Sequence, residues 1–351
     1  MAPYIVLDNL SKAYGTNKVL DGFDLTIEKG DLVAFLGPSG CGKTTALRLI
    51  AGLASMDRGR IIIGGRDISA VPPNKRNTAM VFQSYALFPH MTVTDNIGFG
   101  LKMHGVPKEE TARRIDKIID TARLRGLENR FPRQLSGGQA QRTALARALV
   151  MNPDVLLLDE PLSNLDAKLR HEMRVEIRLL HESLGLTTVF VTHDQDEALT
   201  LADRIVLMNN GKIVQNGGPR EVFENPRSYF AADFTAVRNF FTGTFSDSGA
   251  VFVTGDGLRI SCAARDETKT MVGIRPNNIV LNPPNPENFQ NRFKAVVRLA
   301  SYRGNVIDIL ADLGGRDIIV EVPAVSYNEE LRRGGEISLA WHSRDSILLE
   351  P

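Results

Sequence analysis

Residues 37–44 of this 351-residue chain read GPSGCGKT, which fits the pattern G-x-x-x-x-G-K-[ST]. An apolar run, LVAFLG at 32–37, precedes the pattern, and a helical stretch, KTTALRLIAGL, follows it. Glycines in such a turn let backbone N–H groups converge on phosphate oxygens, and the helix N-terminus adds partial positive charge. We therefore expect a phosphate-binding loop, in which Lys43 reaches the β- and γ-phosphates of a nucleotide and Thr44 holds Mg²⁺.

A second apolar run, VLLLDE at 155–160, ends in two acidic residues. A carboxylate at the end of a buried strand is costly unless it has a partner. The water shell of Mg²⁺ would satisfy Asp159, and Glu160 could orient or deprotonate an attacking water. Alone, the run also fits any strand that ends in an acidic helix cap. The phosphate-loop pattern earlier in the chain favours the catalytic interpretation.

Two further polar side chains follow strand-like runs. His193 ends TTVFVTH at 187–193, and Gln83 follows AMVF at 79–82. Parallel α/β sheets bind ligands at the carboxyl ends of their strands, so His193 could contact a γ-phosphate. A lone histidine is more often a packed or surface residue, and Gln83 could either bind Mg²⁺ or cap a turn.

A second phosphate cradle begins at LSGGQ, residues 135–139, where a serine and two glycines open a helix that runs to about residue 149. The N-terminus of a helix is an anion-binding end, because its first N–H groups have no partner within the helix. The alternative is a simple helix-capping loop. One nucleotide site has no obvious need for two cradles.

The composition limits the function classes. The chain has 42 basic and 41 acidic residues and a net charge of +1, so it lacks the electrostatic footprint of a nucleic-acid-binding protein. Two cysteines do not make a disulfide framework. There is no signal-peptide pattern at the N-terminus, and no apolar run of about 18 residues that could span a membrane. A membrane role would therefore come through a partner.

The pattern of predicted secondary structure changes near residue 240. Before it, buried strand-like runs alternate with helical patterns, as in 166–185, which opens with Asp166 as an N-cap and stops at Gly185. After it, short strand-like runs alternate with Gly, Asn, Asp and Pro turns, which is typical of a small all-β barrel. The stretch 276–288, rich in Pro and Asn, predicts a long surface loop.

The order of these motifs resembles that of the ATP-binding cassette (ABC) ATPases throughout residues 1–235, and LSGGQ between the phosphate loop and VLLLDE is the hallmark of that family. The resemblance implies that Tyr14 in KAYG stacks on adenine. It also identifies Gln83 in VFQS with the Q-loop glutamine, SNLD at 163–166 with the D-loop and His193 with the switch histidine.

The resemblance and the chemistry above together give one set of site residues. The expected catalytic residues are Glu160, His193 and Gln83, and the expected Mg²⁺ ligands are Thr44, Gln83 and Asp159. The expected ATP-binding residues are Tyr14, Gly37, Pro38, Ser39, Gly40, Cys41, Gly42, Lys43, Thr44, Thr45, Ser136, Gly137, Gly138, Gln139 and Asp166.

The family resemblance also accounts for the second cradle. Nucleotide domains of this family pair head to tail, so that the phosphate loop of one chain meets the LSGGQ of the other with ATP between them. The resemblance therefore implies a homodimer with two sites. A helix N-terminus placed against the γ-phosphate would bind ATP better than ADP.

The second part of the chain resembles the TOBE extension, an OB-type fold found on import ATPases. GIRPNNI at 273–279 is similar to the recurrent G-[IV]-R-P-E-x-[IV], with Asn277 in place of the usual acid. We expect an α/β P-loop NTPase cassette, residues 1–236, and an all-β OB-like TOBE domain, residues 240–351, with a role in regulation or dimerisation. The β domain could also be a sensor for a small effector or a regulatory protein.

The resemblance extends to the type of transporter. SYALFPHMTV at 84–93 is closer to the polyamine and iron branches than to the sugar branch, which usually has tyrosine where Phe88 stands. We expect an ATPase for polyamine uptake, such as spermidine or putrescine. Ferric iron, 2-aminoethylphosphonate and sugars are the alternatives, and the phosphonate importers share much of the same sequence in this segment.

The implied partners are two integral-membrane permease subunits and, through them, an extracytoplasmic solute-binding protein. The expected location is the cytoplasmic face of the inner membrane, with no nucleic-acid partner. A distant alternative is a soluble ABC ATPase acting on DNA or ribosomes. Such proteins usually carry two cassettes or a coiled-coil insertion, whereas this chain has one cassette and no sustained heptads.

Overall fold

The computed structural model describes residues 3–246, 249–326 and 331–350. These residues form two compact units, which divide between Arg220 and Glu221. No helix in the described ranges is long and apolar enough to cross a membrane.

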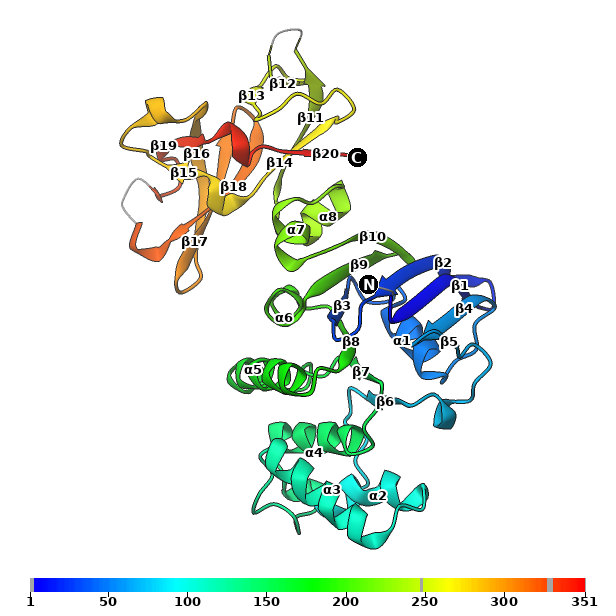
Figure 1. The fold of residues 1–351 in the computed structure, drawn as a ribbon. Coiled ribbons are helices and arrows are strands. Elements are labelled where there is room, and N and C mark those ends of the chain that lie inside the picture. The colour runs from blue at the N-terminus through cyan, green and yellow to red at the C-terminus, as the bar shows by residue number, and fades with distance from the viewer. Residues whose placement is uncertain (1–2, 247–248, 327–330, 351) are drawn as a thin grey trace. The chain divides into compact units, whose positions relative to one another are not determined.

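The first unit is built on a six-stranded sheet with the order β10-β9-β3-β8-β7-β6 (Figure 1). Strands β6, β7, β8, β3 and β9 are parallel, and β10 pairs antiparallel with β9. Every residue of β3, β7 and β8 is buried, as expected for unbroken apolar runs in a parallel sheet. The strands are β3 (Leu32–Leu36), β6 (Thr78–Val81), β7 (Val155–Asp159), β8 (Thr187–Thr192), β9 (Arg204–Asn209) and β10 (Lys212–Gly217).

A second, antiparallel sheet in this unit has the order β2-β1-β4-β5. Its strands are β1 (Ile5–Tyr14), β2 (Asn17–Ile27), β4 (Arg58–Ile63) and β5 (Arg66–Asp67). Helix α1 (Lys43–Ala51) shares one apolar core with strands of both sheets. That core fixes the start of α1, and with it the phosphate loop.

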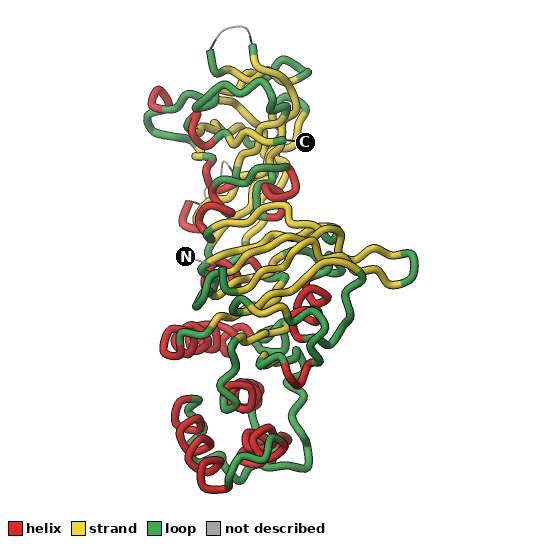
Figure 2. Tube along the Cα trace, turned by 45° about the vertical axis from the view of Figure 1, so that its right-hand side comes forward, coloured by secondary structure: helices red, strands yellow, loops and turns green. Residues whose placement is uncertain are grey.

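The remaining helices of the first unit fall into two groups. Helices α2 (Val93–Met103), α3 (Lys108–Thr121) and α4 (Gly137–Leu149) gather near the β6 edge of the sheet, as both views show (Figures 1 and 2). Helices α5 (Ala167–Leu184) and α6 (Gln195–Leu201) flank β8 in sequence. Helix α5 has the predicted ends, with Asp166 as N-cap and Gly185 in the left-handed conformation at the C-cap.

The second unit is almost entirely β, as predicted. One sheet has the order β13-β12-β11-β14-β20 and the other β15-β19-β16-β17-β18, with antiparallel pairing throughout and one apolar core around Trp341. The strands are β11 (Asn239–Phe245), β12 (Val251–Thr254), β13 (Arg259–Ser261), β14 (Met271–Ile274), β15 (Val280–Leu281), β16 (Asn291–Tyr302), β17 (Val306–Leu313), β18 (Arg316–Pro323), β19 (Glu336–Trp341) and β20 (Ile347–Leu349). The stretch 276–288 is not one long loop, because it contains β15, paired with β19, and two 3₁₀ turns.

Two short helices, α7 (Pro219–Glu224) and α8 (Tyr229–Phe234), precede the β strands. The buried guanidinium of Arg275 donates hydrogen bonds to the carbonyl oxygens of Thr235 and Phe223 and stacks 4.0 Å from the Phe223 ring centroid. These contacts join the helical segment to the β strands, so 221–236 belongs to the second unit. The functional domain bounds 1–236 and 240–351 stay a prediction.

Candidate nucleotide site

The phosphate loop joins β3 to α1 and carries Lys43 at the first helical position. The ammonium group of Lys43 donates to the carbonyl oxygens of Gly37 at 2.7 Å and Pro38 at 2.8 Å. Lys43 is only 5% exposed, and none of the described carboxylates lies within ion-pairing distance of it. A nearly buried cation at a helix N-terminus, without an acidic partner, fits an anionic ligand such as a phosphate.

Different structural constraints require glycine at the different positions of this loop. A Cβ at Gly37 would lie 2.2 Å from the Met208 carbonyl oxygen, and one at Gly42 would lie 2.7 Å from that of Val19. Gly40 has open space around it but a φ of +82°, which favours glycine. Ser39 and Gly40 are exposed at the loop tip. The backbone N–H groups of the tip can therefore reach a phosphate.

Thr44 and Asp159 lie side by side at the carboxyl end of β7. The hydroxyl of Thr44 donates to Oδ1 of Asp159 at 3.0 Å, and Asp159 is only 7% exposed. Burial raises the pKa of Asp159, while the Thr44 hydrogen bond and the charge of Arg48 act in the opposite direction. A hydroxyl and a partly desolvated carboxylate are oxygen donors that suit Mg²⁺. The predicted pair therefore fits that ion.

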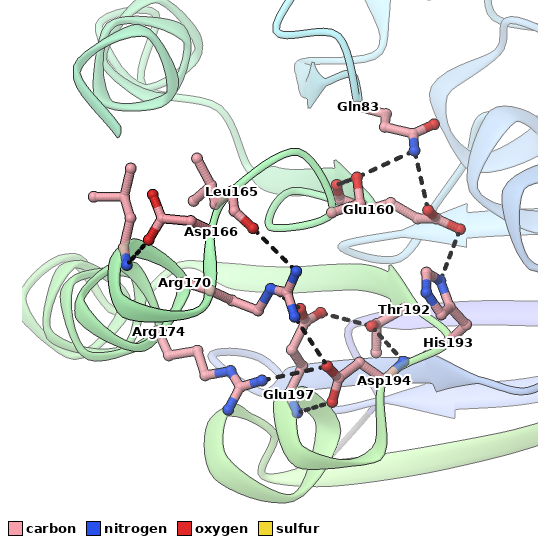
Figure 3. Close-up of polar contacts among 12 residues, drawn as sticks. Gln83, Glu160, Leu165, Asp166, Arg170, Arg174, Thr192, His193, Asp194 and Glu197 are labelled. Atoms are coloured by element: carbon pink, nitrogen blue, oxygen red, sulfur yellow. Dashed lines mark hydrogen bonds and ion pairs between the residues drawn. The ribbon is translucent and has the colours of Figure 1, made fainter. Parts of the chain in front are cut away.

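Gln83, Glu160 and His193 come together, as the sequence predicts (Figure 3). The Gln83 amide donates to Oε2 of Glu160 at 3.2 Å, and Nδ1 of His193 lies 3.5 Å from Oε1 of Glu160. Glu160 has a φ of +45°, an unfavourable conformation for a residue with a side chain, and its N–H donates to the Val191 carbonyl. Such strain is common where a side chain must be aimed at a reacting group.

Gln83 is predicted both as a catalytic residue and as a Mg²⁺ ligand, and its side-chain contacts in the structure include the predicted catalytic group Glu160 but neither of the other predicted Mg²⁺ ligands. Its side-chain hydrogen bonds go to Glu160 and Ser163, and none of them reaches Thr44 or Asp159. Asn164 also donates to the Gln83 carbonyl oxygen at 2.8 Å. Of SNLD, only Asp166 is among the predicted site residues. The motif itself was the signal for its two other polar members, because a loop that follows the acidic strand must pass the same sheet edge.

The second cradle opens α4. Ser136 and Gln139 form a reciprocal capping box, in which Oγ of Ser136 accepts from the Gln139 N–H and Oε1 of Gln139 accepts from the Ser136 N–H. Ser136 and Gly137 are exposed. Within the described residues, no hydrogen bond or ion pair joins 136–139 to the phosphate loop. The two cradles are therefore not brought together by such contacts within one chain.

The glycines of the second cradle also have a packing role. A Cβ at Gly137 would lie 3.0 Å from Cδ2 of Leu165, and one at Gly138 would lie 2.9 Å from Cδ1 of Leu169. Asp166, a predicted nucleotide contact, accepts a hydrogen bond from the Leu169 N–H at 2.9 Å and so caps α5. The start of α4 thus packs closely against the segment that leads into α5.

Tyr14 ends β1 and is 52% exposed, with the ammonium of Lys12 5.3 Å from its ring centroid. An exposed ring face is available for the stacking on a base that the sequence predicts, and that role stays a prediction. Elsewhere, no group of three or more His, Cys, Asp or Glu side chains in the described ranges is arranged to hold a metal ion.

Comparisons with known proteins identify the family. A family model described as "ABC transporter" matches residues 20–163, and one described as "TOBE domain" matches residues 272–349. The Fe(3+) ions import ATP-binding protein FbpC of Pasteurella multocida is 44% identical over 351 residues, covering 99% of this chain and 98% of that protein. The chain belongs to the ABC transporter ATP-binding subunits. It is an import ATPase with a C-terminal TOBE domain, and its cassette binds ATP, as predicted.

Two further comparisons refine this assignment. The spermidine/putrescine import ATP-binding protein PotA of Haemophilus influenzae is 42% identical over 359 residues, covering 99% of this chain and 96% of that protein. A solved dimeric structure of the ATP-binding cassette MJ0796, in a post-hydrolysis state with ADP and Pi, aligns with a TM-score of 0.56. It is 31% identical and covers 62% of this chain and 99% of that chain.

Proposed function

We propose that this ABC subunit acts as a homodimer with Mg²⁺ and energises the import of ferric iron through two permease subunits at the cytoplasmic face of the inner membrane. The observation that carries the ATPase part is the joint placement of Gln83, Glu160 and His193 at the sheet edge that bears Thr44 and Asp159.

The proposed solute corrects the sequence-based expectation of a polyamine. Four relatives named for Fe(3+) import are 43% to 44% identical, whereas the relative named for spermidine and putrescine is 42% identical. The comparisons thus favour the iron alternative over the polyamine.

Each group of the site has a distinct part in hydrolysis. Lys43 and the loop N–H groups bind the phosphates. Thr44 and Asp159 would hold Mg²⁺, which would supply positive charge to offset that of the phosphates. Glu160 accepts a proton from the attacking water or orients it. His193 fixes the Glu160 carboxylate on one side and the γ-phosphate on the other. Gln83 holds Glu160 from the opposite side.

The exposed start of α4 supports a site shared between two chains. The N–H groups of Gly137 and Gly138 have no hydrogen-bond acceptor among the described residues, as expected at the first positions of a helix. These donors suit the γ-phosphate of an ATP held by the partner's phosphate loop. ATP would then join the dimer, and hydrolysis would release it.

A groove between α2 and α3 supports docking of the permeases. It encloses about 840 Å³. Apolar side chains line it, with charged ones among them: Met91, Phe99, Met103, Val106, Ile115 and Ile119, together with Asp95, Lys102, Lys108, Asp116, Arg125 and Glu128. The groove is lined by residues between Met91 and Glu128, which follow Gln83 in the chain. An apolar groove with a charged rim suits an amphipathic helix of a membrane partner.

One arginine fixes the turn between Gln83 and Phe88, and the Phe88 ring lies 4.5 Å from that of Phe99, which lines the groove. Arg147 of α4 donates to the carbonyl oxygens of Tyr85 and Ala86 at 2.9 and 2.8 Å, and it lies 5.4 Å from the Phe88 ring centroid. Tyr85 and Ala86 both have positive φ. The turn after Gln83 is therefore held in a defined conformation, through which a movement of the groove would reach Gln83.

The test is reconstitution of the chain with its own permease subunits in proteoliposomes. We expect the ferric-ion-loaded binding protein encoded with the transporter to stimulate ATP hydrolysis, and spermidine or putrescine to have no effect. Stimulation by a polyamine-loaded binding protein alone would refute the iron assignment and leave the ATPase assignment intact. Salt-sensitive binding of nucleic acid, together with no stimulation by any loaded binding protein, would support the soluble ATPase alternative.

A further inference from the structure

A second polar cluster adjoins Gln83, Glu160 and His193 (Figure 3). Its two acids follow His193 in the chain: Asp194 comes directly after it, and Glu197 lies one helical turn further on in α6. Glu197 is only 4% exposed and accepts a hydrogen bond from the Thr192 hydroxyl at 2.6 Å. The same hydroxyl accepts from the Asp194 N–H. The backbone on both sides of His193 is therefore tied to this cluster.

Arg170, in the first turn of α5, joins this cluster to the segment 163–166. Its Nη2 donates to the carbonyl oxygen of Leu165 at 3.0 Å. Its Nη1 lies 3.9 Å from Oδ2 of Asp194, and its Nε lies 4.0 Å from Oε1 of Glu197. A single guanidinium thus contacts the loop before α5 and lies within 4.0 Å of the two acids that follow His193.

A small movement of the Arg170 guanidinium toward Glu197 would add a hydrogen bond. Its Nε is buried and has no hydrogen-bond partner in the described part of the chain. A buried donor without an acceptor is costly. Movement of the guanidinium by about 1 Å would bring Nε within hydrogen-bonding distance of Glu197. Burial also raises the pKa of Glu197, an effect that the positive charges of Arg174 and Arg170 oppose.

We propose that Arg170 is a positioning residue that couples the segment 163–166 to His193. When this segment moves, the Leu165 carbonyl carries the guanidinium toward or away from Asp194 and Glu197, and the strand end that bears His193 moves with those acids. Because Ser163 also contacts the Gln83 amide, the same movement reaches Glu160 from its other side. The inference rests on the proposed role of His193 in hydrolysis.

The proposed coupling needs the planar guanidinium group of an arginine at position 170. A guanidinium can donate in several directions at once, whereas an ammonium group is a single point charge. We therefore expect Arg170→Lys to keep the attraction to the acids and lose the simultaneous hydrogen bond to Leu165. Its defect should approach that of Arg170→Met.

The chain offers a matched control on the same helix. Arg178 has a similar side-chain exposure, 33% against 32% for Arg170, and also links α5 to the region of α6. It donates to the Leu201 carbonyl and to Asp203, at the other end of α6 from His193. Arg178→Met removes a comparable set of polar contacts at that other end of α6.

The experiment measures kcat and KM for ATP with Mg²⁺, the ATP dissociation constant and the thermal midpoint of full-length variants. We expect Arg170→Met to lower kcat by about ten- to a hundredfold, as for a loss of positioning outside the reacting groups, with little change in KM. Arg178→Met should lower the thermal midpoint about as much as Arg170→Met does, but leave kcat within about twofold of wild type. Equal losses of kcat in both variants would overturn the proposal.

A double-mutant cycle separates the coupling from the role of His193. If Arg170 acts through His193, adding Arg170→Met to His193→Ala should produce no further loss of kcat. Independent losses that multiply would overturn the coupling. A slow His193→Ala variant beside a full-speed Arg170→Met variant would overturn the coupling alone. A His193→Ala variant as fast as wild type would instead refute the proposed role of His193, and the coupling with it.

Discussion

A charge substitution at Ser136 tests whether the second cradle faces a phosphate of another chain. Aspartate and asparagine cap helices about as well as serine does, so Ser136→Asp and Ser136→Asn should both keep the start of α4. Only the aspartate places a negative charge at the exposed helix end. The pair therefore isolates charge, which Gly137→Asp cannot do, because any Cβ at Gly137 would press against Leu165 at 3.0 Å.

The expected magnitude follows from Coulomb's law. Two like unit charges about 4 Å apart repel by about 4 kcal/mol at an effective dielectric constant of about 20. That energy corresponds to about a thousandfold loss of ATP-driven association. Ser136→Asn should stay near wild type, and neither variant should lose much thermal stability.

The assay mixes the Ser136→Asp chain with a Lys43→Ala chain under a different tag and measures association that depends on ATP and Mg²⁺. Each variant alone should fail to associate. In a mixed dimer, one site combines the intact phosphate loop of the Ser136→Asp chain with the intact LSGGQ of the other chain. If half of the dimers are mixed, about one quarter of the wild-type number of sites should be intact. No recovery in a mixture that demonstrably exchanges subunits would refute the shared site.

Three other substitutions test separate parts of the fold and site. Glu160→Gln keeps the shape of the side chain and loses its proton-accepting power, so it should bind ATP but lower kcat by at least about a hundredfold; unimpaired single-turnover hydrolysis would contradict this role. Tyr14→Ala should weaken ATP binding by about 1 kcal/mol without changing the thermal midpoint, as read by nucleotide titration; unchanged ATP and GTP affinities would exclude an adenine platform. Arg76→Met should lower the free energy of unfolding in urea by about 3 kcal/mol, because the buried guanidinium donates to carbonyl oxygens that include Leu49 and Ile50 in the last turn of α1; a loss below that of an exposed Arg113→Met control would show that these bonds do not hold α1.

The parallel sheet and the phosphate loop could be predicted from the sequence because their constraints are local. A buried parallel strand needs an unbroken apolar run, and the loop needs glycines at fixed positions. The structure adds that Gly37 and Gly42 are also required by close approach to the Met208 and Val19 carbonyls. Thus the motif reflects both the ligand and the fold around it.

The features that the sequence alone does not indicate depend on contacts between segments distant in the sequence. Arg275 pins residues 223–235 to the β unit, and nothing in the helical pattern of those residues indicates which unit they join. The strand β15 was missed for a similar reason, since two residues among prolines and asparagines become a strand only by pairing with β19.

The arginine at position 170 was overlooked because the periodicity of α5 classes it as a surface residue. Its partners, the Leu165 carbonyl and the acids beside His193, become visible only once β8 and α5 are placed side by side. The signal in the sequence was weak: three arginines at four-residue spacing in α5, and three acids within four residues after His193.

The packing of the second cradle connects these separate contacts through Leu165. The first glycine of α4 lies against the Leu165 side chain, and the Leu165 carbonyl accepts the hydrogen bond of Arg170. Leu165 is therefore in contact with the helix end that would meet the partner's ATP and with the guanidinium that faces the acids beside His193. Cores are close-packed, so a displacement of the α4 start that pushes Leu165 has to be accommodated at Arg170. By this route, ATP bound at one site of a dimer would adjust the histidine of the other. We therefore expect ATP hydrolysis by the wild-type dimer to rise cooperatively with ATP concentration, and Arg170→Met to remove this cooperativity as well as lower the rate; a non-cooperative wild-type dimer would refute this route.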